Sequence, residues 1–133
     1  MSVETTEPGR APVKPLIYVV DDDPLVAEVV DAILQMQHYR TQVFQNPQSA
    51  LEAFIEADPK PDLLFTDYVM DELNGMELIE KCKRIDPTLR TILYSGSVGQ
   101  EIYQHHGINA DNFLHKPFQP KALLDIIQKT LNS

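Results

Sequence analysis

The sequence predicts a doubly wound α/β fold, in which five parallel strands form one sheet with helices on both faces. Two observations support this prediction. Short apolar runs alternate with longer segments whose apolar residues repeat at helical spacing, which implies a parallel sheet. The run of residues 16–20 is also continuously apolar, as expected of a strand buried on both faces. We expect residues 16–133 to form one domain and residues 1–15, which contain prolines and few large apolar groups, to form a disordered leader.

Composition narrows the classes of function. The chain has 133 residues, the size of one ordinary domain, and a net charge of −9. That charge argues against a general nucleic-acid-binding protein, which needs a basic face for phosphates. The single cysteine, Cys82, excludes an intrachain disulfide, and its place in an apolar helical stripe favours a core residue over a nucleophile. We expect neither a signal peptide nor a membrane span, and therefore a cytoplasmic protein.

The first predicted unit is a strand, an acidic cluster and a helix. The apolar run of residues 16–20 predicts a buried strand, and three aspartates follow it at once. Asp23 before Pro24 is typical of a helix cap followed by a first-turn proline. Apolar residues then repeat at helical spacing, forming the stripe Leu25, Val26, Val29, Val30, Ile33 and Leu34.

The second unit again places a capped helix after a strand. Residues 40–44 predict a strand, and Asn46 before Pro47 predicts the capped start of a helix. The apolar run of residues 63–66 then predicts a third strand, which ends at Asp67. We expect the buried stripe of the intervening helix to consist of Ala50, Leu51, Phe54 and Ile55.

The remaining units follow the same alternation. After a loop over residues 68–75, apolar residues predict a third helix that stops near Pro87. Residues 91–94 predict the fourth strand, residues 98–106 a fourth helix and residues 112–115 the fifth strand. The fourth helix carries little apolar surface, so we expect it to be mobile. The apolar face of the last helix consists of Leu123, Leu124, Ile127 and Leu131.

Reactive side chains follow four of the five predicted strands. The first strand is followed by Asp21 and Asp22, the third ends at Asp67, the fourth at Ser95, and the fifth is followed by Lys116. Because the carboxyl ends of parallel strands share one edge of the sheet, these side chains should converge. Alone, Asp67 is equally well explained as a turn residue or a helix cap, since aspartate favours both. Convergence with the other strand ends favours a chemical role.

The chemistry of this set suits a phosphorylated aspartate. Clustered carboxylates repel one another, so they raise a pKa, bind a cation or do both. Hard oxygen ligands favour Mg²⁺, which uses few carboxylates and engages phosphate. Aspartate is a nucleophile that forms acyl phosphates, and Mg²⁺ with Lys116 would neutralise the charge of a transferring phosphoryl group. Ser95 would donate its hydroxyl to another phosphoryl oxygen.

Motifs in a fixed order also carry a resemblance to a known family. They are Val19-Val20-Asp21-Asp22-Asp23-Pro24, then Thr66-Asp67-Tyr68-Val69-Met70 with Asn74-Gly75, then Tyr94-Ser95-Gly96, and finally Phe113 with Lys116-Pro117-Phe118. The first resembles the opening of the receiver domains of two-component response regulators, and the second resembles their phosphoacceptor segment. The others resemble their switch hydroxyl, switch aromatic and lysine-proline turn. The resemblance covers residues 16–132 and implies the flavodoxin-like, CheY-like form of the doubly wound fold.

The resemblance implies a phosphoacceptor and a metal site. Asp67 would accept a phosphoryl group from a histidine kinase or a histidine phosphotransfer protein. Asp22 and Asp67 would ligate Mg²⁺ directly, together with the backbone carbonyl of Val69, and Asp21 would act mainly through metal-bound water. The protein would not be an enzyme for other substrates, since it would only transfer a phosphoryl group to itself and lose it again.

The resemblance also implies a switch, in which Ser95 moves toward the phosphate and Phe113 turns inward behind it. Ser95 and Lys116 would contact the phosphoryl oxygens. Because these two residues border the segment from residue 98 to 131, we expect a downstream protein effector to bind there, on the fourth helix, fifth strand and last helix. We expect no direct binding of nucleic acid or membrane, and a monomer or a weak phosphorylation-dependent homodimer.

The sequence departs from the family pattern in the loop after Asp67. Asp71 stands at a position that is proline in many members, and Glu72 follows it. Asn74 replaces the usual aspartate before glycine, a mild change because asparagine also tolerates left-handed backbone. These changes concern the shape of the loop rather than the acceptor. No output domain follows residue 133 in this sequence, so we expect a stand-alone receiver.

Two other functions fit parts of the sequence. A Mg²⁺-dependent aspartyl phosphatase would use Asp21 and Asp23 as a nucleophile and acid pair. Against it, Asp23 is better explained as a helix cap, and the chain has no insertion large enough for a substrate-selecting cap domain. The other alternative is a binding module that has kept the fold without phosphorylation. The complete set of acidic, hydroxyl and lysine side chains argues against that module.

Overall fold

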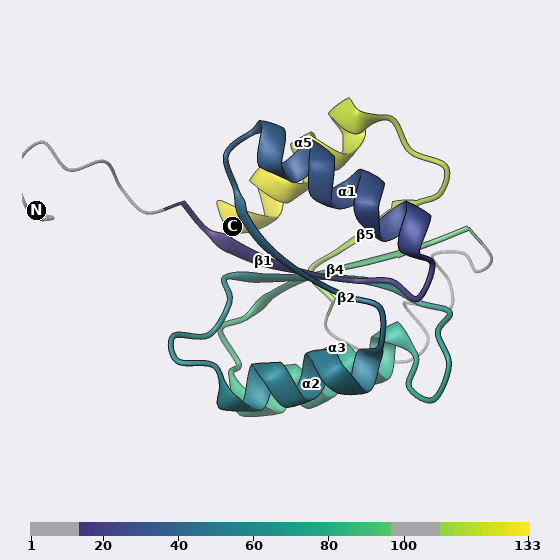
Figure 1. Cartoon of the computed structure of the whole chain (residues 1–133). Helices are drawn as coiled ribbons and strands as arrows, with labels where there is room; N and C mark the ends of the chain where they lie inside the picture. The colour runs from purple at the N-terminus through teal and green to yellow at the C-terminus, as the bar shows by residue number, and fades with distance from the viewer. Residues whose placement is uncertain (1–13, 97–109) are drawn as a thin grey trace, which may run out of the picture.

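A five-stranded parallel sheet lies between two helical layers in the computed structural model of this chain (Figure 1). The structure describes residues 14–96 and 110–133. Within them the doubly wound α/β fold is confirmed, with the strand order β2-β1-β3-β4-β5. The strands are β1 (Leu16–Val20), β2 (Arg40–Phe44), β3 (Leu63–Asp67), β4 (Arg90–Ser95) and β5 (Asn112–His115). The helices are α1 (Pro24–Met36), α2 (Pro47–Glu56), α3 (Gly75–Ile85) and α5 (Pro120–Leu131).

Two expectations concern residues outside the described ranges. The expected leader, residues 1–15, lies outside them except for its last two residues. The expected fourth helix, residues 98–106, lies outside them entirely, so β5 and α5 are the described parts of the expected partner surface. None of the described helices combines the length and the hydropathy that crossing a membrane requires.

Two of the described helices cover each face of the sheet. α1 and α5 lie on one face and α2 and α3 on the other (Figure 1). Successive side chains of a strand point to opposite faces, so Ile17 and Val19 of β1 join the core under α1 and α5. Tyr18 and Val20 join the core under α2 and α3. Burial on both faces explains why the inner strands β1 and β3 read as continuous apolar runs, whereas the edge strand β2 mixes polar and apolar residues and is largely exposed.

Side-chain caps begin the helices α1, α2 and α3, whereas α5 has no side-chain hydrogen bond at its N-cap. Asp23 Oδ1 accepts a hydrogen bond from the backbone N–H of Leu25 at 3.0 Å, and Asn46 caps α2 in the same way. At α3, the side chain of Asn74 accepts from the Glu77 backbone while Glu77 accepts from the Asn74 backbone, which is a capping box. The predicted caps at Asp23 and Asn46 are therefore confirmed.

The buried faces of α1 and α2 are narrower than the predicted stripes. In α1, the fully buried residues are Ala27, Val30 and Leu34, at spacings of three and four. Leu25 and Val29 belong to the predicted stripe but are 72% and 55% exposed. They flank the line of contact, because a helix on a sheet buries only the side that faces it. Ile55 of α2 is 53% exposed for the same reason, so its predicted burial is wrong.

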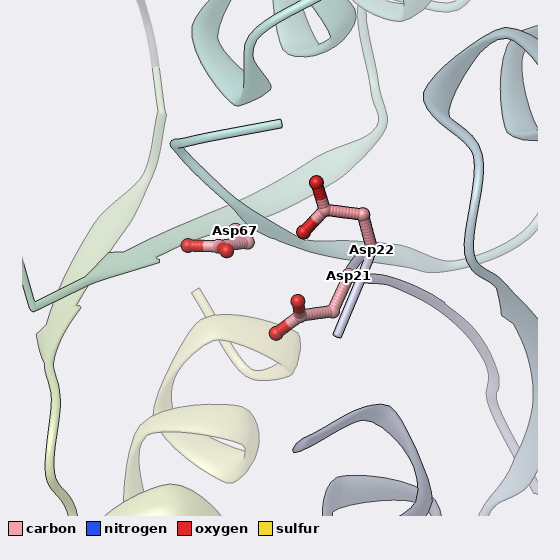
Figure 2. Close-up of side chains that lie close together, drawn as sticks. All are labelled: Asp21, Asp22 and Asp67. Atoms are coloured by element: carbon pink, nitrogen blue, oxygen red, sulfur yellow. The ribbon is translucent and has the colours of Figure 1, made fainter. Parts of the chain in front are cut away.

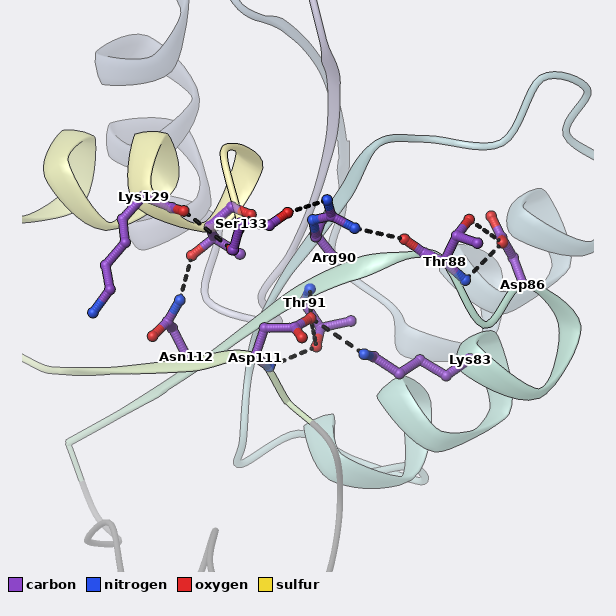
Figure 3. Close-up of polar contacts among 10 residues, drawn as sticks. Lys83, Asp86, Thr88, Arg90, Thr91, Asp111, Asn112, Lys129 and Ser133 are labelled. Atoms are coloured by element: carbon purple, nitrogen blue, oxygen red, sulfur yellow. Dashed lines mark hydrogen bonds and ion pairs between the residues drawn. The ribbon is translucent and has the colours of Figure 1, made fainter.

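Polar contacts tie the strands together at the edge where β4 and β5 begin (Figure 3). Asp111 Oδ2 accepts from the backbone N–H of Thr91 at 2.8 Å and from Lys83 Nζ at 3.2 Å. Asn112 donates its side-chain amide to Thr130 Oγ1 at 2.7 Å. These bonds join β4, β5, α3 and α5 and leave the opposite edge, where the strands end, for the aspartate cluster.

Candidate functional site

Three carboxylates meet where β1 and β3 end. Asp21 and Asp22 follow β1 directly, and Asp67 is the last residue of β3, its neighbour in the sheet. The side chains lie close together (Figure 2), and one carboxylate oxygen of each lies within 4.8 Å of the others. The strand order reverses between β1 and β3, and open α/β sheets bind ligands in the crevice at such a switch point.

Lys116 brings a positive charge to two of these carboxylates. Its Nζ lies 3.3 Å from Asp67 Oδ2 and 3.4 Å from Asp21 Oδ2. Lys116 follows β5 and donates its backbone N–H to the carbonyl oxygen of Ser95 at 3.0 Å, which places it beside the end of β4. The expected convergence of Asp21, Asp67 and Lys116 is therefore observed, although β5 and β1 are not neighbours in the sheet.

Burial and neighbouring charge raise the pKa of Asp67 to about 6. Loss of hydration is the largest cause, and the negative charge of Asp21 adds to it. The ammonium group of Lys116 acts in the opposite direction and favours the ionised form. Strongly perturbed carboxylates with a specific charge partner are concentrated at functional sites. Asp67 is therefore a candidate for chemistry as well as a structural residue.

Asp21 is held by donors on both of its oxygens. Its side chain is completely buried. Oδ1 accepts from the backbone N–H of Asp23 at 2.9 Å, and Oδ2 accepts from the hydroxyl of Tyr94 at 2.7 Å and from Lys116 Nζ. Sequence reasoning gave Tyr94 no role in the site. The available signal was a tyrosine in an otherwise aliphatic strand core, because a buried tyrosine hydroxyl usually finds a polar partner.

The other predicted site residues border the carboxylates. Ser95 ends β4 and is buried. Val69, two residues beyond Asp67, has an exposed side chain. Phe113 of β5 is half-buried, packs against the core under α2 and α3, and meets the ring of His115 edge-on, with centroids 4.7 Å apart. The roles of Ser95 as phosphoryl contact, of the Val69 carbonyl as metal ligand and of Phe113 as switch stay predictions.

The loop after Asp67 closes on itself. The backbone N–H of Gly75 donates to the carbonyl oxygen of Tyr68 at 2.9 Å, across the base of the loop. Glu72 takes up a φ of 71°, in the left-handed region that is costly for a residue with a side chain. The backbone therefore turns sharply at one of the two acidic residues that depart from the family pattern. The observed loop ends one residue earlier than predicted, since Gly75 already belongs to α3.

The donor set fits a hard divalent cation. Asp21, Asp22 and Asp67 offer oxygen ligands, which suit Mg²⁺ better than a softer metal. Three ionised carboxylates outweigh the single ammonium group of Lys116, so a cation would relieve their repulsion. Asp22 is exposed, which leaves the cluster open to the water molecules that Mg²⁺ usually retains. Direct ligation by Asp22 and Asp67 and water-mediated contact by Asp21 stay predictions.

Comparisons with known proteins identify the family. Residues 17–128 match the family model of the response regulator receiver domain. The phosphate regulon transcriptional regulatory protein PhoB of Pseudomonas aeruginosa is 30% identical over 118 residues, which cover 86% of this chain and 51% of PhoB. The chemotaxis protein CheY of Thermotoga maritima is 29% identical over 116 residues, which cover 85% of this chain and 94% of CheY. The chain thus spans about half the length of PhoB.

A solved structure supports the same fold. The crystal structure of a CheY-like response regulator receiver domain protein from Methanospirillum hungatei aligns with a TM-score of 0.81 at 24% identity, over 90% of this chain and 94% of that one. At this level of identity the likeness shows the fold alone. The family match extends over most of the chain and includes Asp21, Asp22, Asp67, Ser95 and Lys116. The chain therefore belongs to the response regulator receiver domain family.

Proposed function

We propose that this chain takes a phosphoryl group onto Asp67, with Mg²⁺ as its cofactor, and thereby signals to a protein partner. One observation carries the proposal. A buried, raised-pKa aspartate at the sheet's switch point lies beside a lysine ammonium group and two further carboxylates. The phosphoryl donor that we propose is the phosphohistidine of a histidine kinase or of a histidine phosphotransfer protein.

The proposed transfer uses a carboxylate oxygen of Asp67 as the nucleophile. It attacks the phosphorus of the donor, the new P–O bond forms, and the P–N bond to the donor histidine breaks as the imidazole nitrogen leaves with the bonding electron pair. Because the pKa of Asp67 is about 6, its carboxylate is largely ionised at neutral pH and therefore ready to attack. Mg²⁺, when bound, would neutralise charge on the phosphoryl oxygens.

Lys116 and Ser95 complete the proposed transfer. The Lys116 ammonium group already lies 3.3 Å from an oxygen of Asp67, so a short movement brings it to a phosphoryl oxygen. Ser95 is buried at the adjacent strand end and carries a hydroxyl that can donate to another phosphoryl oxygen. We propose that this donation starts the switch, with Phe113 and the surface of β5 and α5 passing it to a downstream effector.

The geometry favours a phosphoacceptor over a hydrolase. A phosphatase would need Asp23 as its acid, but Asp23 caps α1 and its carboxylate accepts from Leu25. The carboxylate cluster of the described residues consists of Asp21, Asp22 and Asp67 and does not include Asp23. We therefore propose that the chain is not an enzyme toward other substrates and acts only on its own phosphoryl group.

Intact-mass measurement after incubation with acetyl phosphate and Mg²⁺ distinguishes the three candidate functions. We expect the mass of one phosphoryl group to be added, and the adduct to require Mg²⁺. Repeated turnover of small phosphate esters would instead indicate a hydrolase. The absence of both an adduct and turnover would indicate a binding module. Omitting Mg²⁺ and adding a chelator provides the control for the role of the metal.

A further inference from the structure

Tyr94 links the most buried carboxylate of the site to the hydrophobic core. The residue is completely buried in β4. Its ring stacks on that of Phe65, with centroids 4.2 Å apart and planes 15° apart, and meets the ring of Phe118 edge-on at 6.1 Å. Close packing of this kind leaves a ring little freedom to move. The hydroxyl is therefore presented at a fixed point, 2.7 Å from Asp21 Oδ2.

The Tyr94 hydroxyl and the Lys116 ammonium group share Asp21 Oδ2 unequally. Lys116 Nζ makes a long contact of 3.4 Å with this oxygen, lies 3.3 Å from Asp67 and stands 4.7 Å from the centroid of the Tyr94 ring. Lys116 is thus divided among three partners. A phenol has only one proton to donate, and Tyr94 directs that proton to Asp21.

We propose that Tyr94 is a positioning residue, whose hydroxyl holds Asp21 toward the cation site and leaves Lys116 available to the acceptor. This inference rests on the proposed function, because it gives Tyr94 a task in Mg²⁺ binding and phosphoryl transfer. When Lys116 turns toward a phosphoryl oxygen, Asp21 Oδ2 loses its ammonium partner. The Tyr94 hydroxyl remains, so the buried carboxylate keeps a donor on each oxygen.

The variant Tyr94→Phe isolates the hydroxyl. It keeps the ring that stacks on Phe65 and lies under Lys116, and removes one oxygen atom. Asp21 Oδ2 would then have Lys116 as its remaining donor, which should draw the ammonium group away from Asp67. Loss of groups that orient metal ligands typically weakens metal binding by 10- to 100-fold. We expect the Mg²⁺ dissociation constant of Tyr94→Phe to rise about tenfold.

Tyr18→Phe is the matched control. Tyr18 is almost completely buried, but it lies on the opposite face of the sheet, in the core under α2 and α3, and packs against Phe44 and Phe54. The substitution removes the same hydroxyl oxygen from the same type of residue and leaves the aspartates unchanged. We expect Tyr18→Phe to bind Mg²⁺ like the wild type. Thermal unfolding of both variants confirms that the protein measured is folded.

The test combines calorimetric Mg²⁺ titration of the full chain with proton NMR of the Tyr94 hydroxyl. In the metal-free wild type we expect a slowly exchanging hydroxyl resonance that is absent from Tyr94→Phe and present in Tyr18→Phe. In the wild type, this resonance should shift with the same midpoint as the calorimetric titration. That last measurement needs no variant and so decides the matter even if Tyr94→Phe does not fold.

Each outcome decides for or against the positioning role. The role is overturned if Tyr94→Phe has the same Mg²⁺ dissociation constant as the wild type. It is also overturned if the hydroxyl resonance of the wild type does not shift when Mg²⁺ is added. A wild type that binds no Mg²⁺ overturns the proposed function and this inference together. These failures are distinguishable, because in the first case the wild type still binds the ion.

Discussion

Gly75 lies directly against the backbone carbonyl group of Asp67. A Cβ atom added to Gly75 would overlap the carbonyl oxygen of Asp67 and lie 2.9 Å from its carbonyl carbon. It would also lie 2.8 Å from Cδ1 of Leu93 in the neighbouring strand. The first residue of α3 is therefore part of the wall that fixes the backbone of the proposed acceptor, and this position has no room for a side chain.

Gly75→Ala should destabilise the protein and displace Asp67. Overpacking typically costs about 1–3 kcal/mol, and here the obstacle is backbone that cannot rotate away. Urea unfolding measures the loss. Gly96→Ala is the control, because its added Cβ would lie 3.3 Å from the side-chain Cβ of Lys116, a less severe approach. Equal stability of the two variants would show that the contact between Gly75 and Asp67 imposes no constraint.

Mg²⁺ should stabilise the folded protein through the carboxylate cluster. An ion that binds only the folded state adds about 2.7 kcal/mol at a free concentration 100 times its Kd. Thermal melts with and without Mg²⁺ should show a higher midpoint for the wild type and a much smaller shift for Asp22→Ala. Asp71→Ala, which removes an exposed carboxylate from the loop, should keep the full shift. A full shift in Asp22→Ala would contradict the assignment of Asp22 as a ligand.

The stability of the metal-free protein should depend on pH through Asp67. Its pKa is raised in the folded state from 3.8 to about 6, so the folded state binds the proton more tightly than the unfolded chain. The stabilisation from this proton is full below the unfolded pKa and is lost as pH rises through about 6. At pH 7 the ionised Asp67 is therefore a cost, which Asp67→Asn removes. One pKa unit is worth about 1.4 kcal/mol, so the variant should be more stable by at most about 3 kcal/mol.

Unfolding of Asp67→Asn and the wild type over a pH series, in the presence of a chelator, measures this difference. The advantage of the variant should shrink as pH falls from about 7 toward 4. Asp71→Asn serves as the control for the loss of one negative charge in the same loop. A stability difference for Asp67→Asn that does not change with pH would show that burial does not set the proton affinity of Asp67.

Phosphorylation should alter β5 and α5 as well as the acceptor loop. Ser95 and Lys116 border both regions, and a hydrogen bond from Ser95 formed in one state only would bias the two arrangements. A coupling of about 1–3 kcal/mol is enough for a useful switch. Amide NMR before and after addition of a stable phosphate mimic should show shifts in residues 112–131. Shifts confined to residues 66–75 would contradict the proposed partner surface.

Much of this fold could be predicted because its signals are local. Continuous apolar runs marked the inner strands β1 and β3, and an acidic or amide residue before proline marked the starts of α1 and α2 at Asp23 and Asn46. The composition of the aspartate cluster was also predictable, since parallel strands end on one edge. It was harder to predict which apolar residues each helix buries. Periodicity locates the apolar side of α1, but the width of its contact with the sheet leaves Leu25 and Val29 exposed.

The contact between Tyr94 and Asp21 could not be predicted from spacing. It joins residues 73 positions apart and depends on strand register, since Tyr94 pairs with Asp67 in β3 while its hydroxyl reaches across to the end of β1. The left-handed backbone of Glu72 is likewise a property of how the loop closes rather than of local preference. Both features arise from tertiary packing around the site.

Phosphoryl uptake by Asp67→Asn tests most directly whether Asp67 is the phosphoacceptor. The variant keeps the size of the side chain and removes the nucleophilic carboxylate. With labelled acetyl phosphate and Mg²⁺, we expect the wild type and the control Asp71→Asn to take up one phosphoryl group and Asp67→Asn to take up none. Uptake by Asp67→Asn at the wild-type rate would contradict the assignment of Asp67 as the phosphoacceptor.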